Sequence, residues 1–390
     1  MSEIGRGGNL TEAGLAVLHC GGRLGVTMSS IRGLEIAVLC VCLGAVAGCS
    51  FTGPAKVKDG RRLYNAAVQE TNKEQMLLNI VRLRFLDTPF FLQVASVSTN
   101  FTFESSAAAG GGASPSFAIF GLAGRVASSP TVTYTPLQGE QFAERLLAPV
   151  DLSTIFLLTN TGWSIQRVFR LCVQSLEGLP NAPRASGPTP TDPPVYERFM
   201  RATELLRSLQ KQGELTIGYE GEPGEGTYVL EIASEALDWP ETRELTELLG
   251  LEPNRDRYRI VPGTGHSEPN TIGIAPRSLT GSFFYVSHGV EVPQDDLAAG
   301  RVTVTRKPDG EEFDWSPFSR GLLEIRSSED RPDDAAVAVS YRDTWFYIAD
   351  TDIDSKATFS LLMQLFALSA GETPSTAPIL TLPVGIGSVR

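Results

Sequence analysis

The chain has 390 residues, of which 42% are hydrophobic and 20% are charged, and its formal net charge is −12 at pH 7. This composition is typical of a globular protein with a sizeable hydrophobic core, and the length suggests about two domains. The acidic balance argues against nucleic acid as a partner, because a phosphate backbone attracts basic surfaces.

The N-terminal part carries a targeting pattern. An apolar run begins at Ile36 and ends in the small residues Val46, Ala47 and Gly48, which Cys49 follows. An apolar stretch of about a dozen residues closed by small residues is typical of a secretory signal peptide. The run is shorter than the ~20 residues that a transmembrane helix needs. We therefore expect residues 1–48 to be a cleaved signal peptide.

The start of this signal peptide is expected at Met28. The segment before Met28 is longer than the basic region of a typical signal peptide, and it contains the acidic residues Glu3 and Glu12. Translation from Met28 would give a compact basic region that contains Arg32.

The four residues Val46-Ala47-Gly48-Cys49 resemble the lipobox of bacterial lipoproteins. The resemblance implies cleavage before Cys49 and attachment of acyl chains such as palmitate, which anchor the protein in a lipid membrane. Ser50, rather than aspartate, follows the cysteine, as in lipoproteins that are sent to the outer membrane. The resemblance therefore implies a lipid-anchored protein at the periplasmic face of the outer membrane.

Only Cys172 of the five cysteines would remain free after cleavage and acylation. No intrachain disulfide can then form, even in an oxidising compartment. Cys172 lies on the apolar face of a predicted helix, where a small buried hydrophobic residue is expected.

A tether over residues 49–60 is expected to precede a helix over residues 61–85. Thr71-Asn72-Lys73-Glu74 matches the capping-box pattern, so the helix is expected in one or two pieces. Apolar residues then recur at helical spacing, namely Met76, Leu77, Ile80, Val81 and Leu83.

Residues 88–139 contain only two charged residues, Glu104 and Arg125. Apolar and polar residues alternate from Ala95 to Glu104, which predicts a half-buried strand. A glycine-rich stretch separates this strand from an apolar return segment, so we predict a β-hairpin over residues 91–135. Possible membrane or oligomer contacts on this hairpin are Val97, Phe101, Phe103, Phe120 and Leu122.

The rest of the chain mixes helices and strands. Helices are predicted at 139–147, 152–158, 164–176, from Asp192 onward, 240–249, 279–286 and 355–368. Strands are predicted at 215–219, 228–232, 257–261, 302–305, 322–327, 336–341, 345–348 and 379–382. A proline-rich linker at 179–194 would divide a helical domain with the hairpin, 61–178, from an α+β domain, 195–390. The expected class is α+β, with a mixed antiparallel sheet and helices in the C-terminal half.

Two candidate sites are better explained by structural roles. Asp350-Thr351-Asp352-Ile353-Asp354 looks like the start of a calcium loop, but Ser355 and Leu361 stand where that loop needs glycine and glutamate. We therefore expect Asp354 to cap the last helix. The chain has no G-x-S-x-G motif that would supply a nucleophile for His266 or His288. The two histidines also lack the spacing of zinc ligands, so no catalytic residue, metal or cofactor is expected.

The stretches Glu74–Arg84 and Trp345–Ile348 are similar to uncharacterised lipoproteins of Gram-negative bacteria, a resemblance that implies no known activity. We expect a non-enzymatic structural, assembly or binding component of the cell envelope, with a second copy or an envelope protein as partner. One alternative is an oligomeric pore or secretion lipoprotein that inserts the 91–135 hairpin into the membrane. Another is a hydrolase whose site is not visible in the sequence.

Overall fold

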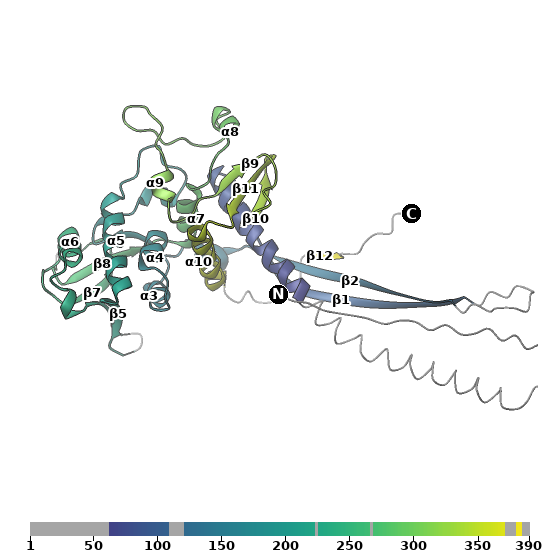
Figure 1. Cartoon of the computed structure of the whole chain (residues 1–390), viewed down its shortest axis with the longest axis horizontal. Coiled ribbons are helices and arrows are strands. Elements are labelled where there is room, and N and C mark those ends of the chain that lie inside the picture. Colours follow the sequence, from purple (N-terminus) through teal and green to yellow (C-terminus); the bar gives the residue numbers. More distant parts are fainter. Residues whose placement is uncertain (1–61, 109–120, 223–224, 266–267, 371–379, 384–390) are drawn as a thin grey trace, which may run out of the picture. The chain divides into compact units, whose positions relative to one another are not determined.

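A computed structural model describes residues 62–108, 121–222, 225–265, 268–370 and 380–383 (Figure 1). The described residues from Ala67 onward belong to one compact unit. The described residues have the predicted α+β fold, with helices and three sheets. The predicted signal peptide, the tether and Cys49 lie outside the described residues.

The first described helix spans residues 62–84 without interruption. The expected capping box at Thr71 is therefore wrong, because the Thr71 hydroxyl donates to the carbonyls of Ala67 and Val68, at 3.0 and 3.1 Å, inside the helix. The predicted apolar face is confirmed: Met76, Leu77, Ile80 and Val81 are at most 2% exposed. None of the described helices is both long enough and apolar enough to span a membrane.

Two amide side chains of this helix hold the beginning of β1, Phe91–Ala108. Asn79 donates to the Phe90 carbonyl at 2.8 Å and accepts from the Phe90 amide at 2.9 Å. Gln75 makes the same pair of bonds with Leu92, at 3.1 and 2.7 Å. The helix therefore supplies the hydrogen bonds that a neighbouring strand would otherwise give to this part of β1.

Phe91 fixes the same end of β1 through an aromatic cluster. Its ring lies 6.4 Å from Phe142 of α2, 6.0 Å from Phe283 of α7 and 4.5 Å from Phe366 of α10. These helices span Glu140–Leu147, Leu279–Ser287 and Ile353–Ala370. Phe91 is 3% exposed, so the hairpin base belongs to the core.

β1 pairs antiparallel with β2, Gly121–Leu137, which confirms the predicted hairpin, and β2 also pairs with β12, Leu380–Pro383. The register shifts between Val94 and Ser96, so Ala95 is the extra residue of a bulge and the alternation starts one residue later than expected. Beyond the bulge the apolar positions meet, as in Phe103 opposite Val126. The two charged positions, Glu104 and Arg125, are also register partners.

Helices α3, Leu152–Asn160, and α4, Ile165–Cys172, follow α2. The helix expected to reach Leu176 ends earlier, because the chain becomes extended at Val173 and continues as β3, Val173–Leu176. β3 pairs with β8, Thr271–Pro276, so a tertiary pairing overrides the local helical pattern. Cys172 is a free, fully buried thiol, as predicted.

A six-stranded mixed sheet has the order β4-β3-β8-β7-β6-β5, with β7 and β8 parallel and the other pairs antiparallel. Its other strands are β4, Leu179–Pro180; β5, Leu215–Glu220; β6, Thr227–Ile232; and β7, Arg257–Pro262. The sequence predicted β5, β6 and β7 but missed β8. The residues from Thr271 to Ile274 are all buried, so no polar alternation marks this strand.

The proline-rich segment 179–194 is packed, which corrects the expected interdomain linker. Asn181, Ala182 and Ala185 are fully buried, and Pro183–Ser186 form a short 3-10 helix. The Asn181 amide donates to the carbonyls of Arg170 and Val173, at 2.9 and 2.7 Å. Side-chain hydrogen bonds thus add to the pairing of β4 with β3 here, and one hydrophobic core includes residues from both sides of the segment.

The second half contains α5, Glu197–Gln212; a 3-10 helix, Ser234–Ala236; α6, Pro240–Leu249; α8, Gln294–Ala298; and α9, Ser316–Ser319. α6 and α7 confirm the prediction closely. α5 begins later than expected, because Asp192 forms an ion pair with Arg184 at 3.0 Å instead of capping the helix.

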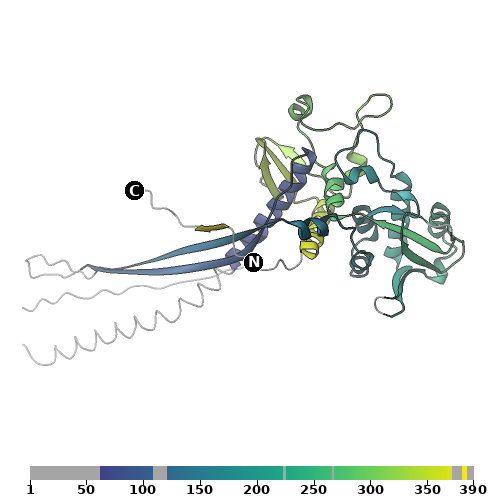
Figure 2. The same cartoon turned by 180° about the vertical axis from the view of Figure 1, so that it is seen from behind.

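A three-stranded sheet has the order β10-β11-β9, with β9 at Arg326–Ser328, β10 at Ala335–Tyr341 and β11 at Thr344–Ala349. It lies beside the helix over residues 62–84 in both views (Figures 1 and 2). Phe85 joins the two through ring contacts of 5.4 Å with Tyr341 and 6.1 Å with Phe346.

Two expected strands in this region are corrected. Residues 302–305 form no strand, because Thr305 is buried and its hydroxyl donates to the Pro190 carbonyl at 2.5 Å. The strand expected at 322–327 shrinks to β9, since Leu322 and Leu323 pack into the core without pairing.

Candidate functional site

A basic pocket of about 550 Å³ lies between α4, α5, the end of α9 and the start of α10. Five cationic side chains line it: Arg167, Arg170, Arg207, Lys211 and Arg320. Two carboxylates, Glu204 and Asp354, also line it. In a chain with a net charge of −12, this local excess of positive charge stands out.

The first wall is α4, which contributes Arg167 and Arg170. Ser164 caps the helix by accepting from the Arg167 amide at 3.4 Å. Arg167 and Arg170 are three residues apart and therefore neighbours on the helix surface.

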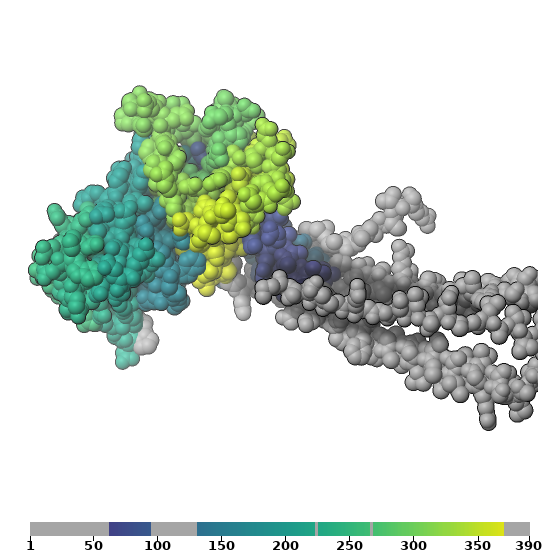
Figure 3. Space-filling model, viewed as in Figure 1, coloured from purple at the N-terminus to yellow at the C-terminus, as the bar shows by residue number. Residues whose placement is uncertain are grey.

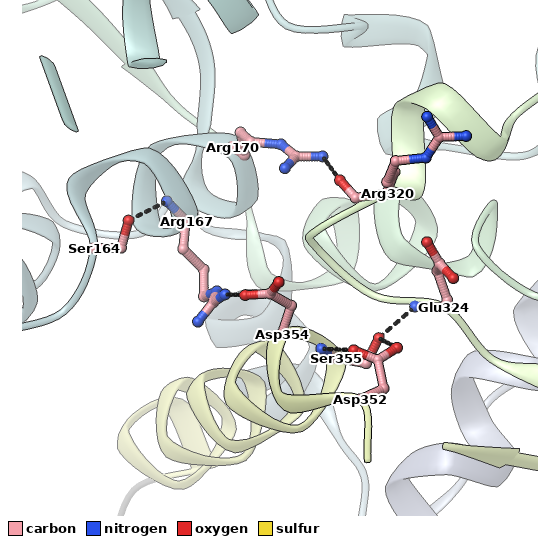
Figure 4. Close-up of polar contacts among 8 residues, drawn as sticks. All are labelled: Ser164, Arg167, Arg170, Arg320, Glu324, Asp352, Asp354 and Ser355. Carbon is pink, nitrogen blue, oxygen red and sulfur yellow. Dashed lines mark hydrogen bonds and ion pairs between the residues drawn. The ribbon is translucent and has the colours of Figure 1, made fainter. Parts of the chain in front are cut away.

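Arg170 is the most buried of the pocket arginines, at 4% exposed. One of its Nη atoms donates to the carbonyls of Phe318 and Arg320, at 2.8 and 3.1 Å, which holds the end of α9 against α4 (Figure 4). Its Nε has no partner. Burial lowers the pKa of Arg170, yet an arginine remains charged at neutral pH.

Arg167 links α4 to the beginning of α10 through an ion pair with Asp354 (Figure 4). The pairing leaves the Arg167 Nε buried and without a partner. Arg167 and Arg170 thus each have an Nε donor near the pocket that is held in place and makes no hydrogen bond. Guanidinium donors held in this way suit the oxygens of phosphate or carboxylate groups.

The opposite wall is α5, which contributes Glu204, Arg207 and Lys211 at spacings of three and four residues. Arg207 donates to Gln210 at 2.6 Å, and Gln210 in turn bonds the Trp163 carbonyl at 3.1 Å. Arg207 is therefore oriented before any ligand arrives, whereas Lys211 is exposed. Glu204 pairs with Arg201 at 3.4 Å, which partly neutralises its charge.

The Asp350–Asp354 stretch has structural contacts that differ from the expected ones. Asp352, rather than Asp354, caps α10, because its carboxylate accepts from the Ser355 amide at 3.0 Å and from the Ser355 hydroxyl at 2.7 Å. The Ser355 hydroxyl itself accepts from the Glu324 amide at 2.8 Å (Figure 4). Within the described ranges, no group of three or more His, Cys, Asp or Glu side chains is placed to hold a metal ion.

The other predicted site residues are divided among several places. The lipobox residues, Cys49, His266 and Phe120 lie outside the described residues. Val97, Phe101, Phe103 and Leu122 fall on the two paired strands of the hairpin, with Val97 opposite Val132 and Leu122 opposite Ala107. His288 is buried in a different cavity, lined also by Arg84 and Trp315.

Sequence reasoning missed the basic pocket. Arg-x-x-Arg on α4 was a visible signal, and so was the spacing of Arg207 and Lys211 on α5. Neither pair is unusual on a solvated helix, however, and their approach to Arg320 depends on the tertiary fold.

In comparisons with known proteins, no family model, no curated protein and no solved structure matches this chain. Any functional conclusion therefore depends on the residues themselves.

Proposed function

We propose that this protein is a lipid-anchored, non-enzymatic component of the bacterial cell envelope that binds a phosphate-bearing ligand in the basic pocket. The observation that carries the proposal is the set of five cations around a cavity of about 550 Å³ in an otherwise acidic chain. Arg170 and Arg167 supply fixed donors, while Arg207, Lys211 and Arg320 supply charge nearer the opening.

The ligand is expected to carry at least one phosphate. Bidentate arginine donors match phosphate oxygens, and the surrounding positive charge offsets the cost of desolvating an anion. The same chemistry occurs in free phosphates and in the headgroups of anionic lipids, so the test must separate these two sources.

The test uses the full-length Cys49→Ala protein, so that acyl chains do not contribute to membrane binding. Pyrophosphate binding is measured by calorimetry, and vesicles of phosphatidylglycerol are compared with vesicles of phosphatidylcholine by co-sedimentation. Arg207→Gln combined with Lys211→Gln should weaken binding at least about tenfold, and raising the ionic strength from ~0.05 to ~0.5 M should weaken it further.

Arg255→Gln is the matched control, because Arg255 is an exposed arginine that pairs with Glu252 at 2.9 Å and does not line the pocket. Pyrophosphate binding alone would identify a soluble phosphate compound as the ligand. Selective vesicle binding would identify a headgroup. Equal affinities of the double variant and the control, or no binding of either probe, would refute the proposal.

The anchor part of the proposal follows from the Val46–Cys49 pattern and has its own test. Cells supplied with labelled palmitate should incorporate the label into the protein, and Cys49→Ser should abolish the incorporation. Cys172→Ser is the control, because Cys172 is fully buried in the folded chain. Label that persists in the Cys49→Ser protein would exclude the lipobox assignment.

A second candidate function is an oligomeric pore formed by the hairpin, and one observation favours it. The register brings apolar positions together, as in Val97 with Val132 and Phe103 with Val126, and it sets Glu104 opposite Arg125. β1 has 18 residues and β2 has 17. These lengths exceed the ~9–11 residues that a transmembrane strand needs.

The pore would depend on the apolar positions of the ribbon. Phe101→Asp combined with Leu122→Asp should abolish the oligomer that is detected as a large native mass in mild detergent. The double variant should also be extracted from the membrane more easily than the wild type. Thr102→Asp combined with Ala123→Asp is the matched control, since these neighbours occupy the alternate positions of the same strands. A monomeric wild type, or equal behaviour of the two double variants, would eliminate the pore.

A further inference from the structure

A second cavity, of about 840 Å³, adjoins the basic pocket at Arg320, which lines both, but is formed mostly by other segments. The segment 288–297, the segment 312–326 and Arg84 provide most of its lining. Figure 3 shows a hollow between green parts of the chain, with purple atoms from its N-terminal described part at the floor.

Two side chains in the cavity lining have a polar atom that no protein group satisfies, namely the Nε of Arg84 and the Nε1 of Trp315. A third, His288, has one ring nitrogen facing the Ala185 backbone, which leaves its other ring nitrogen without a partner. Arg84 is 6% exposed and His288 is 4% exposed. Buried polar atoms in folded proteins nearly always have hydrogen-bond partners, so several unsatisfied ones around a single cavity indicate a place for a polar occupant.

The three side chains are held rigidly. Arg84 donates through Nη1 to the Thr189 hydroxyl at 3.1 Å and to the Thr303 carbonyl at 3.2 Å. The ring of His288 stacks on Trp315 with centroids 4.0 Å apart and an interplanar angle of 10°. The unused donors and acceptors therefore keep fixed directions.

The protonation states of these groups define what they can bind. Burial, and then the nearby charge of Arg84, lower the pKa of His288 to about 3, so its ring is neutral; its N–H faces the Ala185 backbone, and its other nitrogen offers an acceptor. Arg84 Nε and Trp315 Nε1 are donors. Glu312 and Asp314 add acceptors to the lining. The occupant must consequently both accept and donate hydrogen bonds, as hydroxyl groups do.

Charge argues against an anionic occupant. Four carboxylates line the cavity, namely Glu291, Glu312, Asp314 and Glu324, against three arginines, namely Arg84, Arg320 and Arg326. This balance is opposite to that of the basic pocket. A neutral ligand avoids repulsion from the carboxylates.

The cavity also has an aromatic surface. Phe313 and Trp315 meet edge to face, with centroids 5.0 Å apart, and both line the cavity. Aromatic side chains supply a rigid, largely apolar surface, and the indole adds a polar handle at its edge. Sugar rings present C–H groups on their faces and hydroxyls around their rims, which matches this combination.

We propose that this cavity binds a neutral saccharide of a few sugar rings. Trp315 and His288 would form hydrogen bonds with hydroxyl groups of the sugar, and Arg84 would be a further donor. The volume falls within the range of ~300–1,000 Å³ of small-molecule sites. The proposal does not depend on phosphate binding at the basic pocket.

The experiment is calorimetry of the full chain in mild detergent with chitotriose, maltotriose and cellotriose. Pyrophosphate is the anionic comparison. Trp315→Phe keeps an aromatic ring but removes the indole N–H, and it should weaken binding of the preferred trisaccharide at least about tenfold. Glu312→Gln, at the exposed edge, should weaken it at least about threefold and provides a variant with little risk to folding.

Trp345→Phe is the control, because Trp345 lies in β11 and does not line the cavity. Tight trisaccharide binding by wild type and control, weakened by both test substitutions, supports the proposal. Failure of all three trisaccharides to bind at about 10 mM, where even millimolar affinities are detected, would overturn it. Trisaccharide binding that neither test substitution changes would overturn it equally.

Discussion

Arg277 and Tyr285 meet in the core, with the Arg277 guanidinium carbon 3.8 Å from the centre of the Tyr285 ring and both residues fully buried. The guanidinium also donates to the carbonyls of Arg170, Leu171 and Asn181, at 3.1, 3.0 and 2.7 Å. Burial lowers the pKa of Arg277 to about 10, so it remains charged at neutral pH. This contact connects α7 to the end of α4 and to the proline-rich segment.

Arg277→Met should strongly destabilise the protein, because it removes the donor to the buried Asn181 carbonyl, one of two donors to each of the Arg170 and Leu171 carbonyls, and the cation–π contact. We expect a loss of about 3–5 kcal/mol in the free energy of unfolding, measured by urea denaturation. Arg243→Met is the control, since Arg243 is exposed and pairs with Asp238 at 2.8 Å, and it should change stability by less than about 0.5 kcal/mol. Equal effects of the two substitutions would show that the buried network contributes nothing.

Gln75 and Asn79 hold the hairpin base, and this arrangement predicts a local effect. Asn79→Leu leaves the amide and carbonyl of Phe90 unpaired, which should cost about 1–3 kcal/mol. Hydrogen exchange at the first residues of β1 should accelerate before exchange in the six-stranded sheet does. Gln69→Leu, at an exposed position of the same helix, should leave the exchange unchanged. Unaltered protection of the Phe90 amide in Asn79→Leu would contradict the structure.

His288 should make stability depend on pH. Its pKa is lowered from 6.5 to about 3 in the folded state, so below pH 6.5 the unfolded chain binds a proton that the folded protein does not. Stability therefore falls as the pH falls between about 6.5 and 3, by ~2 kcal/mol at pH 5. His288→Phe keeps a ring against Trp315 but removes this proton. The difference in unfolding free energy between wild type and variant should shift by that amount from pH 7 to pH 5. Parallel curves would refute the assignment.

Cys172 should be chemically inert in the folded protein. Burial raises the pKa of its thiol to about 12, and only a thiolate reacts rapidly with alkylating reagents. Brief treatment with iodoacetamide at neutral pH, followed by peptide mapping, should leave Cys172 unmodified. The same treatment in concentrated urea should modify it fully. Modification under native conditions at the rate of a free thiol would show that α4 opens readily.

Local pattern was sufficient for much of the secondary structure. The helix over residues 62–84, α6 and α10 follow from helical spacing of apolar residues, and the hairpin follows from alternation and its lack of charge. These elements each bury one face, so their periodicity is visible in sequence. The α+β class follows from the same elements.

Tertiary structure determined the other elements, because burial hides their sequence pattern or because they pair with segments distant in the chain. β8 is buried throughout its first four residues and shows no alternation. The residues of β3 continue a helical sequence pattern, yet they are extended because they pair with β8. The segment 179–194 has the composition of a linker, yet Asn181 and its hydrogen bonds place it in the core.

The amino-acid sequence by itself determined the α+β class, the long hairpin and the lipobox pattern at Cys49, because each is encoded in neighbouring residues. Only the tertiary structure brought Arg167, Arg170, Arg207, Lys211 and Arg320 around one pocket and set His288 against Trp315. Residues far apart in the chain acquire a common chemistry only when packing fixes their distances and removes water from between them.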